Sequence, residues 1–296
     1  HIAAAQERAG NIGALASTLE RIVELGGNQT EVLVQLAKVR TRLGQDTAAG
    51  IAWVAAADAA IILGALKDAR AMVAAGIEAA PGYLPLRVRQ AQVASREGEH
   101  AAAISAFRSA ADLAMGTGQL DVARSALVQL RRLRPDDLII RIQLAEVAEH
   151  LKDDDTERFM RDVVRCAVRG NNQGMALQYA RRRVAYVGQP AFEARAELIE
   201  LQRRTGDHAG ELINGRELLE QLLEHAEVEK ATELLQRLVA SNPRNVDLVL
   251  QLADLHAAVD DLRQAGRYYR YAVTLFQVEN RLPEALKALD QLAELS

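Results

Sequence analysis

Three arginines at a constant spacing are the residues of this sequence best suited to binding a ligand. Arg87, Arg141 and Arg195 stand 54 residues apart. A guanidinium binds carboxylates and phosphates through paired hydrogen bonds, so three of them along one groove could hold an acidic or phosphorylated ligand. The alternative is structural, because an arginine can lay its aliphatic stem along a helix and keep its charge in water. The spacing allows both interpretations.

The sequence contains little that indicates a catalytic site or a metal site. The six histidines include His100 and His208 at equivalent positions, but none has the spacing of metal ligands such as HExxH. Glycine motifs that cradle phosphates do not occur. The single cysteine, Cys166, excludes an internal disulfide, and we expect it to be partly exposed because the equivalent positions are mostly polar. We therefore predict a protein that is not an enzyme and that holds no cofactor and no metal.

The arginines belong to a repeat that runs through the chain. We call positions that are 54 residues apart a column. Two columns hold residues that tolerate the left-handed turn at the end of a helix, mainly glycine and asparagine. The first contains Gly44, Gly98, Lys152, Gly206 and Asp260, and the second contains Gly10, Gly64, Gly118, Asn172, Ala226 and Asn280. These columns predict that helices end at fixed points of every repeat.

Each repeat contains three amphipathic helix patterns. In the second repeat, the middle pattern has Ala103, Phe107, Ala110 and Ala114 at spacings of one helical face. The large residue of this face recurs as Trp53 and Tyr269, whereas Arg161 and Gly215 occupy its column in the third and fourth repeats. Prolines near the boundaries define repeats at 28–80, 81–134, 135–189, 190–242 and 243–296, with 1–27 as the end of a preceding repeat. We predict about sixteen helices, no strands and one continuous array, because a single repeat cannot cover its own apolar faces.

The last repeat resembles the tetratricopeptide repeat (TPR). Leu252-Ala253, the turn residues Asp260-Asp261, and Ala265, Tyr269 and Ala272 match the family's pattern of small and large positions. The period differs, because a TPR repeats about every 34 residues with two helices. The resemblance implies an all-α, right-handed α-solenoid with one extra helix per repeat. It also implies a scaffold that binds a protein or peptide partner, and Arg87, Arg141 and Arg195 are the candidate contacts.

Composition and charge limit the functions that remain. The 296 residues have a net charge of −4, which disfavours a general nucleic-acid binder. No apolar run is long enough to span a membrane. The chain begins inside a repeat, so we expect a piece of a longer, cytoplasmic protein. Two functions stay open: a non-catalytic interaction scaffold, or the regulatory sensor domain of a larger signalling or transcription protein.

The last helical pattern leaves leucines without a following repeat to cover them. Leu286, Leu289, Leu292 and Leu295 lie on this face. A bare apolar end favours burial, so we expect either more repeats in the full protein or contacts between copies through the repeat ends.

Overall fold

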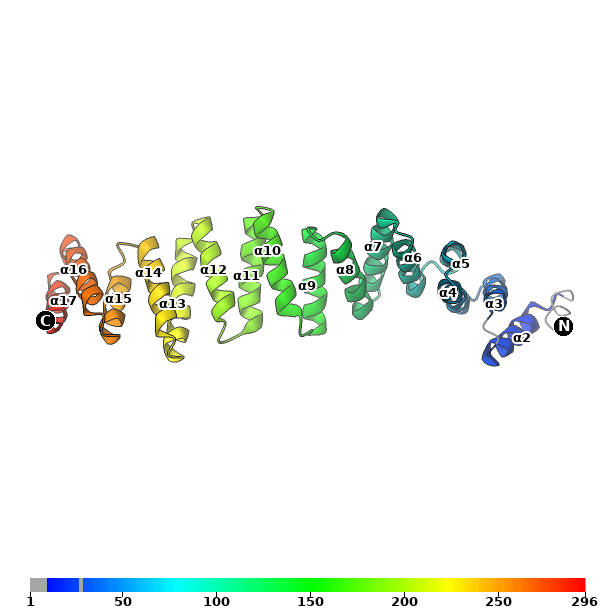
Figure 1. The fold of residues 1–296 in the computed structure, drawn as a ribbon, viewed down its shortest axis with the longest axis horizontal. Coiled ribbons are helices and arrows are strands. Elements are labelled where there is room, and N and C mark those ends of the chain that lie inside the picture. Colours follow the sequence, from blue (N-terminus) through cyan, green and yellow to red (C-terminus); the bar gives the residue numbers. More distant parts are fainter. Residues whose placement is uncertain (1–9, 27–28, 296) are drawn as a thin grey trace. The chain divides into compact units, whose positions relative to one another are not determined.

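The computed structural model describes residues 10–26 and 29–295, and in these residues every regular element is an α-helix (Figure 1). Sixteen helices are found in these ranges, with no strand among them. Their bounds are α2 (Ile12–Glu24), α3 (Thr30–Arg42), α4 (Asp46–Ile62), α5 (Leu66–Ala79), α6 (Leu84–Arg96), α7 (His100–Gly116), α8 (Leu120–Leu133), α9 (Leu138–Leu151), α10 (Thr156–Arg169), α11 (Gln173–Val187), α12 (Phe192–Thr205), α13 (His208–Glu224), α14 (Val228–Ser241), α15 (Val246–Ala258), α16 (Leu262–Val278) and α17 (Leu282–Glu294). The predicted all-α fold and number of helices are confirmed, and each predicted repeat contains three helices.

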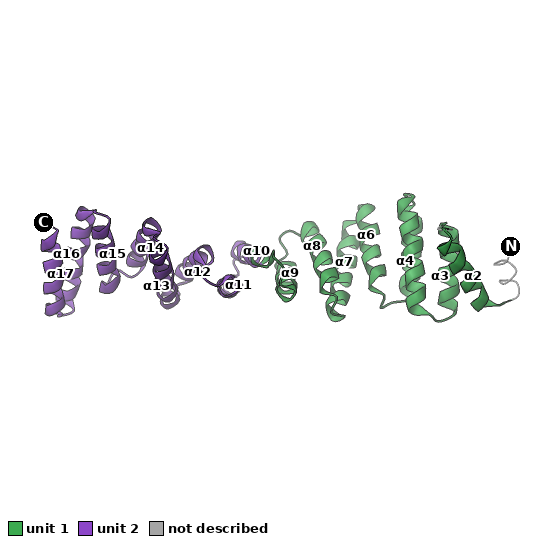
Figure 2. Ribbon diagram, turned by 90° about the horizontal axis from the view of Figure 1, so that it is seen from below, with its two compact units in different colours: residues 1–159 green, residues 160–296 purple. Residues whose placement is uncertain are grey.

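The chain divides into two compact units, residues 1–159 and residues 160–296 (Figure 2). We call them the N-terminal unit and the C-terminal unit. Within each unit, helices that follow one another in the chain pack against each other as TPR-like hairpins. The division falls inside α10. A single continuous right-handed array stays a prediction.

Left-handed residues end the helices where the first column predicts them. Gly44, Gly98, Lys152, Gly206 and Asp260 all have a positive φ, between 53° and 75°. The second column is confirmed at five positions and wrong by one residue in the third repeat. There Asn171, with a φ of 54°, takes the left-handed conformation in place of Asn172. Asn172 instead begins the next helix, because its side chain accepts a hydrogen bond from the backbone N–H of Met175 at 3.1 Å.

The buried face of α10 lies one residue earlier than the column predicts, from Thr156 in its first turn onward. This helix has 14 residues, whereas α7 and α13 have 17. Met160 is completely buried in α10 and supplies the large residue that the 54-residue column places at Arg161. Cys166 is buried as well, so the expectation that it is partly exposed is wrong. The shift ends before α12, because α11 has 15 residues where α8 and α14 have 14.

Large and small residues exchange places between helices in two repeats. Trp53 in α4 packs on Gly76 in α5, where an added Cβ would lie 2.8 Å from the Cβ of Trp53. The fourth repeat has the reverse arrangement. Gly215 in α13 faces Leu238 in α14, whose two methyl carbons would be 2.8 Å from an added Cβ. The missing aromatic residue at Gly215 is thus compensated by the leucine of the next helix, and the core stays closed.

Within each unit, the helices alternate between two layers, so each helix lies beside the next but one. α4 contacts α6, and α3 contacts α5. Ion pairs follow the same rule in the N-terminal unit: Arg89 of α6 binds Asp58 of α4 at 2.5 Å, and Arg108 of α7 lies 3.6 Å from Asp137 at the start of α9. In the C-terminal unit, Arg181 of α11 binds Asp207 at the start of α13 at 3.1 Å. Because a repeat has three helices, equivalent helices of successive repeats within one unit lie in opposite layers.

Candidate functional site

Arg87 and Arg141 lie in the N-terminal unit, and Arg195 lies in the C-terminal unit. Arg87 lies on α6 and Arg141 on α9, and both are half-buried. By the alternation described above, these helices belong to opposite layers of the N-terminal unit. Arg141 also donates a hydrogen bond to the backbone carbonyl of Pro135 at 3.0 Å. The layer alternation gives no support to a groove shared by Arg87 and Arg141, and a partner contact by the three predicted arginines stays a prediction.

Arg195 is buried in the C-terminal unit and forms contacts within it. Its side chain forms an ion pair with Glu217 of α13 and donates to the side-chain oxygen of Asn214 at 3.2 Å. Asn214 in turn donates to Gln202 at 3.2 Å. Gln202 donates to Asp207 at the same distance. These groups form a polar network between α12 and α13, in which Arg195 has a structural role.

The network changes the ionisation of its terminal carboxylate. The backbone N–H of Gly210, followed by the amide of Gln202, donates to Asp207 and lowers the pKa of this carboxyl below its usual value. Arg181 contributes to the same shift. Asp207 is also the N-cap of α13, so the network fixes how this helix begins.

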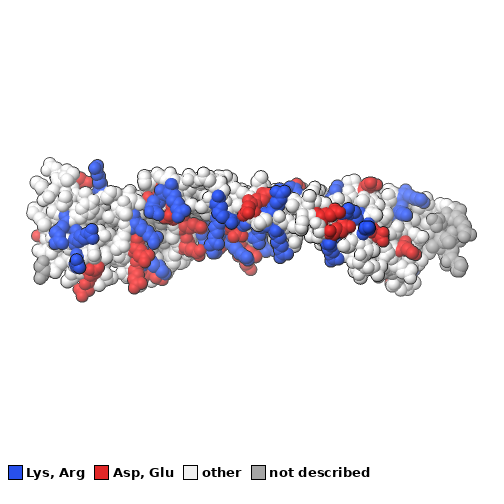
Figure 3. Space-filling view, turned by 45° about the horizontal axis from the view of Figure 1, so that its top comes forward, with Lys and Arg blue, Asp and Glu red and all other residues white. Residues whose placement is uncertain are grey.

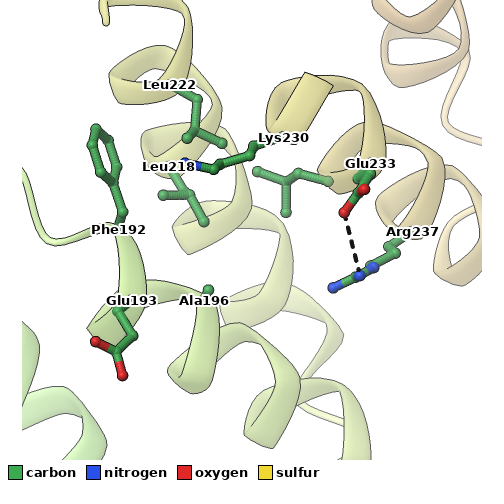
Figure 4. A pocket seen from close by; sticks show the side chains of 9 residues that line it. Phe192, Glu193, Ala196, Leu218, Leu222, Lys230, Glu233 and Arg237 are labelled. Atoms are coloured by element: carbon green, nitrogen blue, oxygen red, sulfur yellow. Dashed lines mark ion pairs between the residues drawn. The ribbon is translucent and has the colours of Figure 1, made fainter. Parts of the chain in front are cut away.

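A pocket of about 330 Å³ lies beside this network, and its walls come from three consecutive helices. We call it the Phe192 pocket. It is lined by Phe192, Glu193 and Ala196 of α12, Leu218 and Leu222 of α13, and Lys230, Glu233, Leu234 and Arg237 of α14. Figure 4 shows Phe192, Leu218 and Leu222 together, with the side chain of Lys230 extending toward them. The pocket therefore has apolar walls and a charged rim.

A small residue opens the pocket. Ala196 stands in a column whose other members are all larger: Val34, Val88, Ile142 and Leu250. Those four side chains are half-buried, while Ala196 is exposed at the pocket. The space that a branched side chain occupies in the other repeats is free in the fourth one. The contrast between Ala196 and the larger residues of its column is visible in the sequence, but it was not recognised there as the sign of a pocket.

The charges of the rim are nearly balanced by neighbouring residues. Lys230 lies 3.0 Å from Glu227, and Arg237 lies 3.7 Å from Glu233. Phe192 meets the ring of His225 edge to face, with 5.2 Å between the ring centres, which holds the aromatic wall in place. A balanced rim around apolar walls suits one large apolar side chain of a peptide better than a charged group.

The described residues contain neither a candidate metal site nor a candidate membrane-spanning helix. Residues 10–26 and 29–295 contain no cluster of three or more His, Cys, Asp or Glu side chains that could hold a metal ion. In the same ranges, no helix is long and apolar enough to cross a bilayer. Acidic and basic side chains lie close together on the face in Figure 3, as expected for surfaces connected by ion pairs.

The last helix exposes fewer leucines than the sequence indicated. Leu286 and Leu289 are 63% and 41% exposed. Leu292 and Leu295 pack against the core around Tyr269, so the expectation that all four are exposed is wrong for these two. Self-association through this end stays a prediction.

No family model and no curated protein matches this chain. Solved structures that resemble it include a signal-transduction ATPase with a tetratricopeptide repeat sensor from Pyrococcus horikoshii. It is 14% identical, with a TM-score of 0.35, and the match covers 90% of this chain and 53% of that one. Yeast Tom70 is 16% identical, with a TM-score of 0.28 and coverages of 96% and 58%. MamA is 12% identical, with a TM-score of 0.21 and coverages of 62% and 96%. The chain spans about half the length of the first three structures it matches, and such distant similarity says nothing about partners.

Proposed function

We propose that this protein is a non-catalytic interaction scaffold that binds a peptide segment of a partner protein by taking an apolar side chain into the Phe192 pocket. The observation that supports this most directly is Ala196, which leaves an apolar cavity where the other repeats have a branched or longer side chain. The buried network of Arg195, Asn214 and Gln202 holds α12 against α13 and keeps the cavity walls in position.

A ligand-responsive sensor is the second candidate. The cavity volume of about 330 Å³ also falls at the lower end of the range of pockets for small molecules. The same pocket would serve either function, so the nature of its occupant, a peptide or a small molecule, distinguishes a scaffold from a sensor.

Selection of peptides with paired proteins tests the proposal. A displayed random-peptide library is selected on the wild-type protein and depleted on Ala196→Ile, and the enriched peptides are measured by fluorescence anisotropy. Burial of one Leu or Phe side chain contributes about 1.5–3 kcal/mol. Filling the pocket should therefore weaken binding about 10- to 150-fold. Val88→Ile is the matched control, because it enlarges a residue of the same column that already fills its site.

Two results would count against the scaffold function. One is that no enriched peptide distinguishes wild-type protein from Ala196→Ile. The other is that small apolar compounds, rather than peptides, protect the wild-type protein from thermal unfolding and lose this effect in Ala196→Ile. The second result would identify a sensor.

A further inference from the structure

A second groove lies in the other layer of the C-terminal unit, between α13 and α15. Its volume is about 660 Å³, twice that of the Phe192 pocket. We call it the α13–α15 groove. Its walls include Leu219, Glu220 and Leu223 of α13 and Gln251, Asp254 and Leu255 of α15. Its flanking helices differ from those of the Phe192 pocket, which are α12 and α14, so the two sites open on opposite layers.

The floor of this groove is apolar and its rim is acidic. Leu219 and Leu235 are buried beneath it, and Leu223 is 45% exposed. The rim has three carboxylates, Glu220, Asp247 and Asp254, and one guanidinium, Arg216. This excess of negative charge determines which partner the leucines can receive.

The carboxylates lack cations that equivalent residues have elsewhere in the chain. Arg89 of α6 donates two hydrogen bonds to the carboxylate of Asp58 on α4, the neighbouring helix of the same layer, at 2.5 and 2.9 Å. Three repeats later, the same two positions are Glu220 of α13 and Gln251 of α15. The arginine is thus replaced by a neutral amide, and Glu220 has no ion pair within the described part of the chain.

Asp254 also lacks the neighbouring cations that its equivalent in the preceding repeat, Glu200, has. In the preceding repeat, Glu200 accepts hydrogen bonds from Arg203 at 2.7 Å and from Arg204 at 2.7 Å. The positions equivalent to these arginines in the last repeat are Ala257 and Ala258. Asp254 instead accepts a hydrogen bond from the hydroxyl of Tyr269 at 2.5 Å. This bond orients the carboxylate without neutralising its charge.

We propose that the α13–α15 groove binds a basic amphipathic segment of a second partner protein. Its apolar side chains lie on Leu219, Leu223 and Leu255, and its Lys or Arg side chains pair with Glu220 and Asp254. A helix laid along a groove between two helices makes contacts of this kind. The uncompensated carboxylates select a basic segment and reject an acidic one, because like charges at an interface oppose binding. This site goes beyond the Phe192 pocket and is independent of it.

The test restores the missing arginine. Gln251→Arg places a cation beside Glu220, as Arg89 lies beside Asp58. Gln143→Arg is the matched control, because it makes the same change at the same column in the N-terminal unit. The probe is a fluorescein-labelled amphipathic helix of Leu and Lys, compared with its Leu and Glu counterpart by fluorescence anisotropy. Loss of a pair at a partly exposed site should weaken binding of the Lys peptide about two- to fivefold, and Gln143→Arg should leave it unchanged.

Further variants test the same carboxylates and the independence of the groove from the Phe192 pocket. Ala258→Arg restores a cation beside Asp254 and should act like Gln251→Arg, even if one of the two fails to fold. Glu220→Gln with Asp254→Asn should weaken binding further, and Ala196→Ile should have no effect on this peptide. Equal binding to Gln251→Arg and Gln143→Arg, or tighter binding of the Glu peptide, overturns the proposal. If sedimentation shows self-association that Gln251→Arg removes, the occupant is a second copy of this chain, which also overturns it.

Discussion

Substitution of Gly76 by alanine tests the exchange of large and small residues between α4 and α5. Gly76 lies inside α5, where alanine normally stabilises a helix by about 0.5–1 kcal/mol relative to glycine. Here the added Cβ would lie 2.6 Å from a methyl carbon of Leu86 and 2.8 Å from the Cβ of Trp53. The methyl group can rotate away, but the Cβ of Trp53 is fixed to the backbone of α4.

The steric cost should exceed the gain in helix propensity. Overpacking a closed core costs about 1–3 kcal/mol. Subtracting the propensity gain of about 0.5–1 kcal/mol leaves a net loss of up to about 2.5 kcal/mol for Gly76→Ala, with a central value of about 1 kcal/mol. Gly116→Ala is the control, because Gly116 also lies in a helix and an added Cβ there meets no atom within 4 Å. We expect this control to be neutral or slightly stabilising.

Urea unfolding of the N-terminal unit can be followed by tryptophan fluorescence, because Trp53 is the only tryptophan of the chain. Gly76→Ala should lower the midpoint without changing the slope of the transition. Gly215→Ala should cost less than Gly76→Ala when followed by circular dichroism, since the nearest atoms there are the mobile methyl carbons of Leu238. A midpoint for Gly76→Ala that rises as much as for Gly116→Ala would refute the close packing of α4, α5 and α6.

Four further outcomes are expected. Arg195→Gln should lower the free energy of unfolding by about 1–3 kcal/mol in chemical denaturation, because it removes charged hydrogen bonds from a buried network, while Arg87→Gln should change it by less than about 0.5 kcal/mol. Burial and the hydrogen bond to Asp254 raise the pKa of Tyr269, so an alkaline absorbance titration should show one tyrosine that ionises above the ordinary range and that Tyr269→Phe removes, and its stabilising contribution, complete below about pH 10, is lost as the pH rises further. Arg203, and then Arg204, lower the pKa of Glu200 against the opposing effect of burial, so its contribution is present above about pH 4.3 and is lost in acid, and Arg203→Gln should reduce this loss in acid unfolding. Leu289→Glu should reduce concentration-dependent light scattering, and an unchanged, strictly monomeric signal in both proteins would contradict self-association through α17.

The ends of the helices could be predicted from the sequence, but the register of α10 could not. Residues with a positive φ are rare outside glycine and asparagine, so a column rich in them indicates where a helix ends. In the third repeat, however, Gly170, Asn171 and Asn172 stand next to each other, and each could end the helix. The structure selects Asn171, in step with a buried face that contains Thr156 and Met160, each one residue before its column position. Packing therefore decided a question on which the local propensities were nearly equal.

The Phe192 pocket was within reach of the sequence, whereas the polar network was not. Ala196 is the one small residue of its column, and that difference can be read without a structure. In contrast, Arg195 shares its column with two half-buried arginines and is itself buried. Its burial depends on Glu217 and Asn214, which lie on another helix and follow no pattern that the sequence makes visible.

The odd number of helices per repeat changes how a column should be interpreted. In an array of two-helix repeats, every copy of a helix faces the same side, so a column marks one surface. Within one unit of this chain, equivalent helices of successive repeats alternate between layers, and residues of one column share a layer only every second repeat, or 108 residues, as Val34 and Ile142 do in the N-terminal unit. This explains why Arg87 and Arg141 lie apart despite their regular spacing. It also gives the C-terminal unit two separate sites, because the Phe192 pocket and the α13–α15 groove use different pairs of flanking helices. A partner in one site leaves the other open, so the two proposed partners should bind together rather than compete.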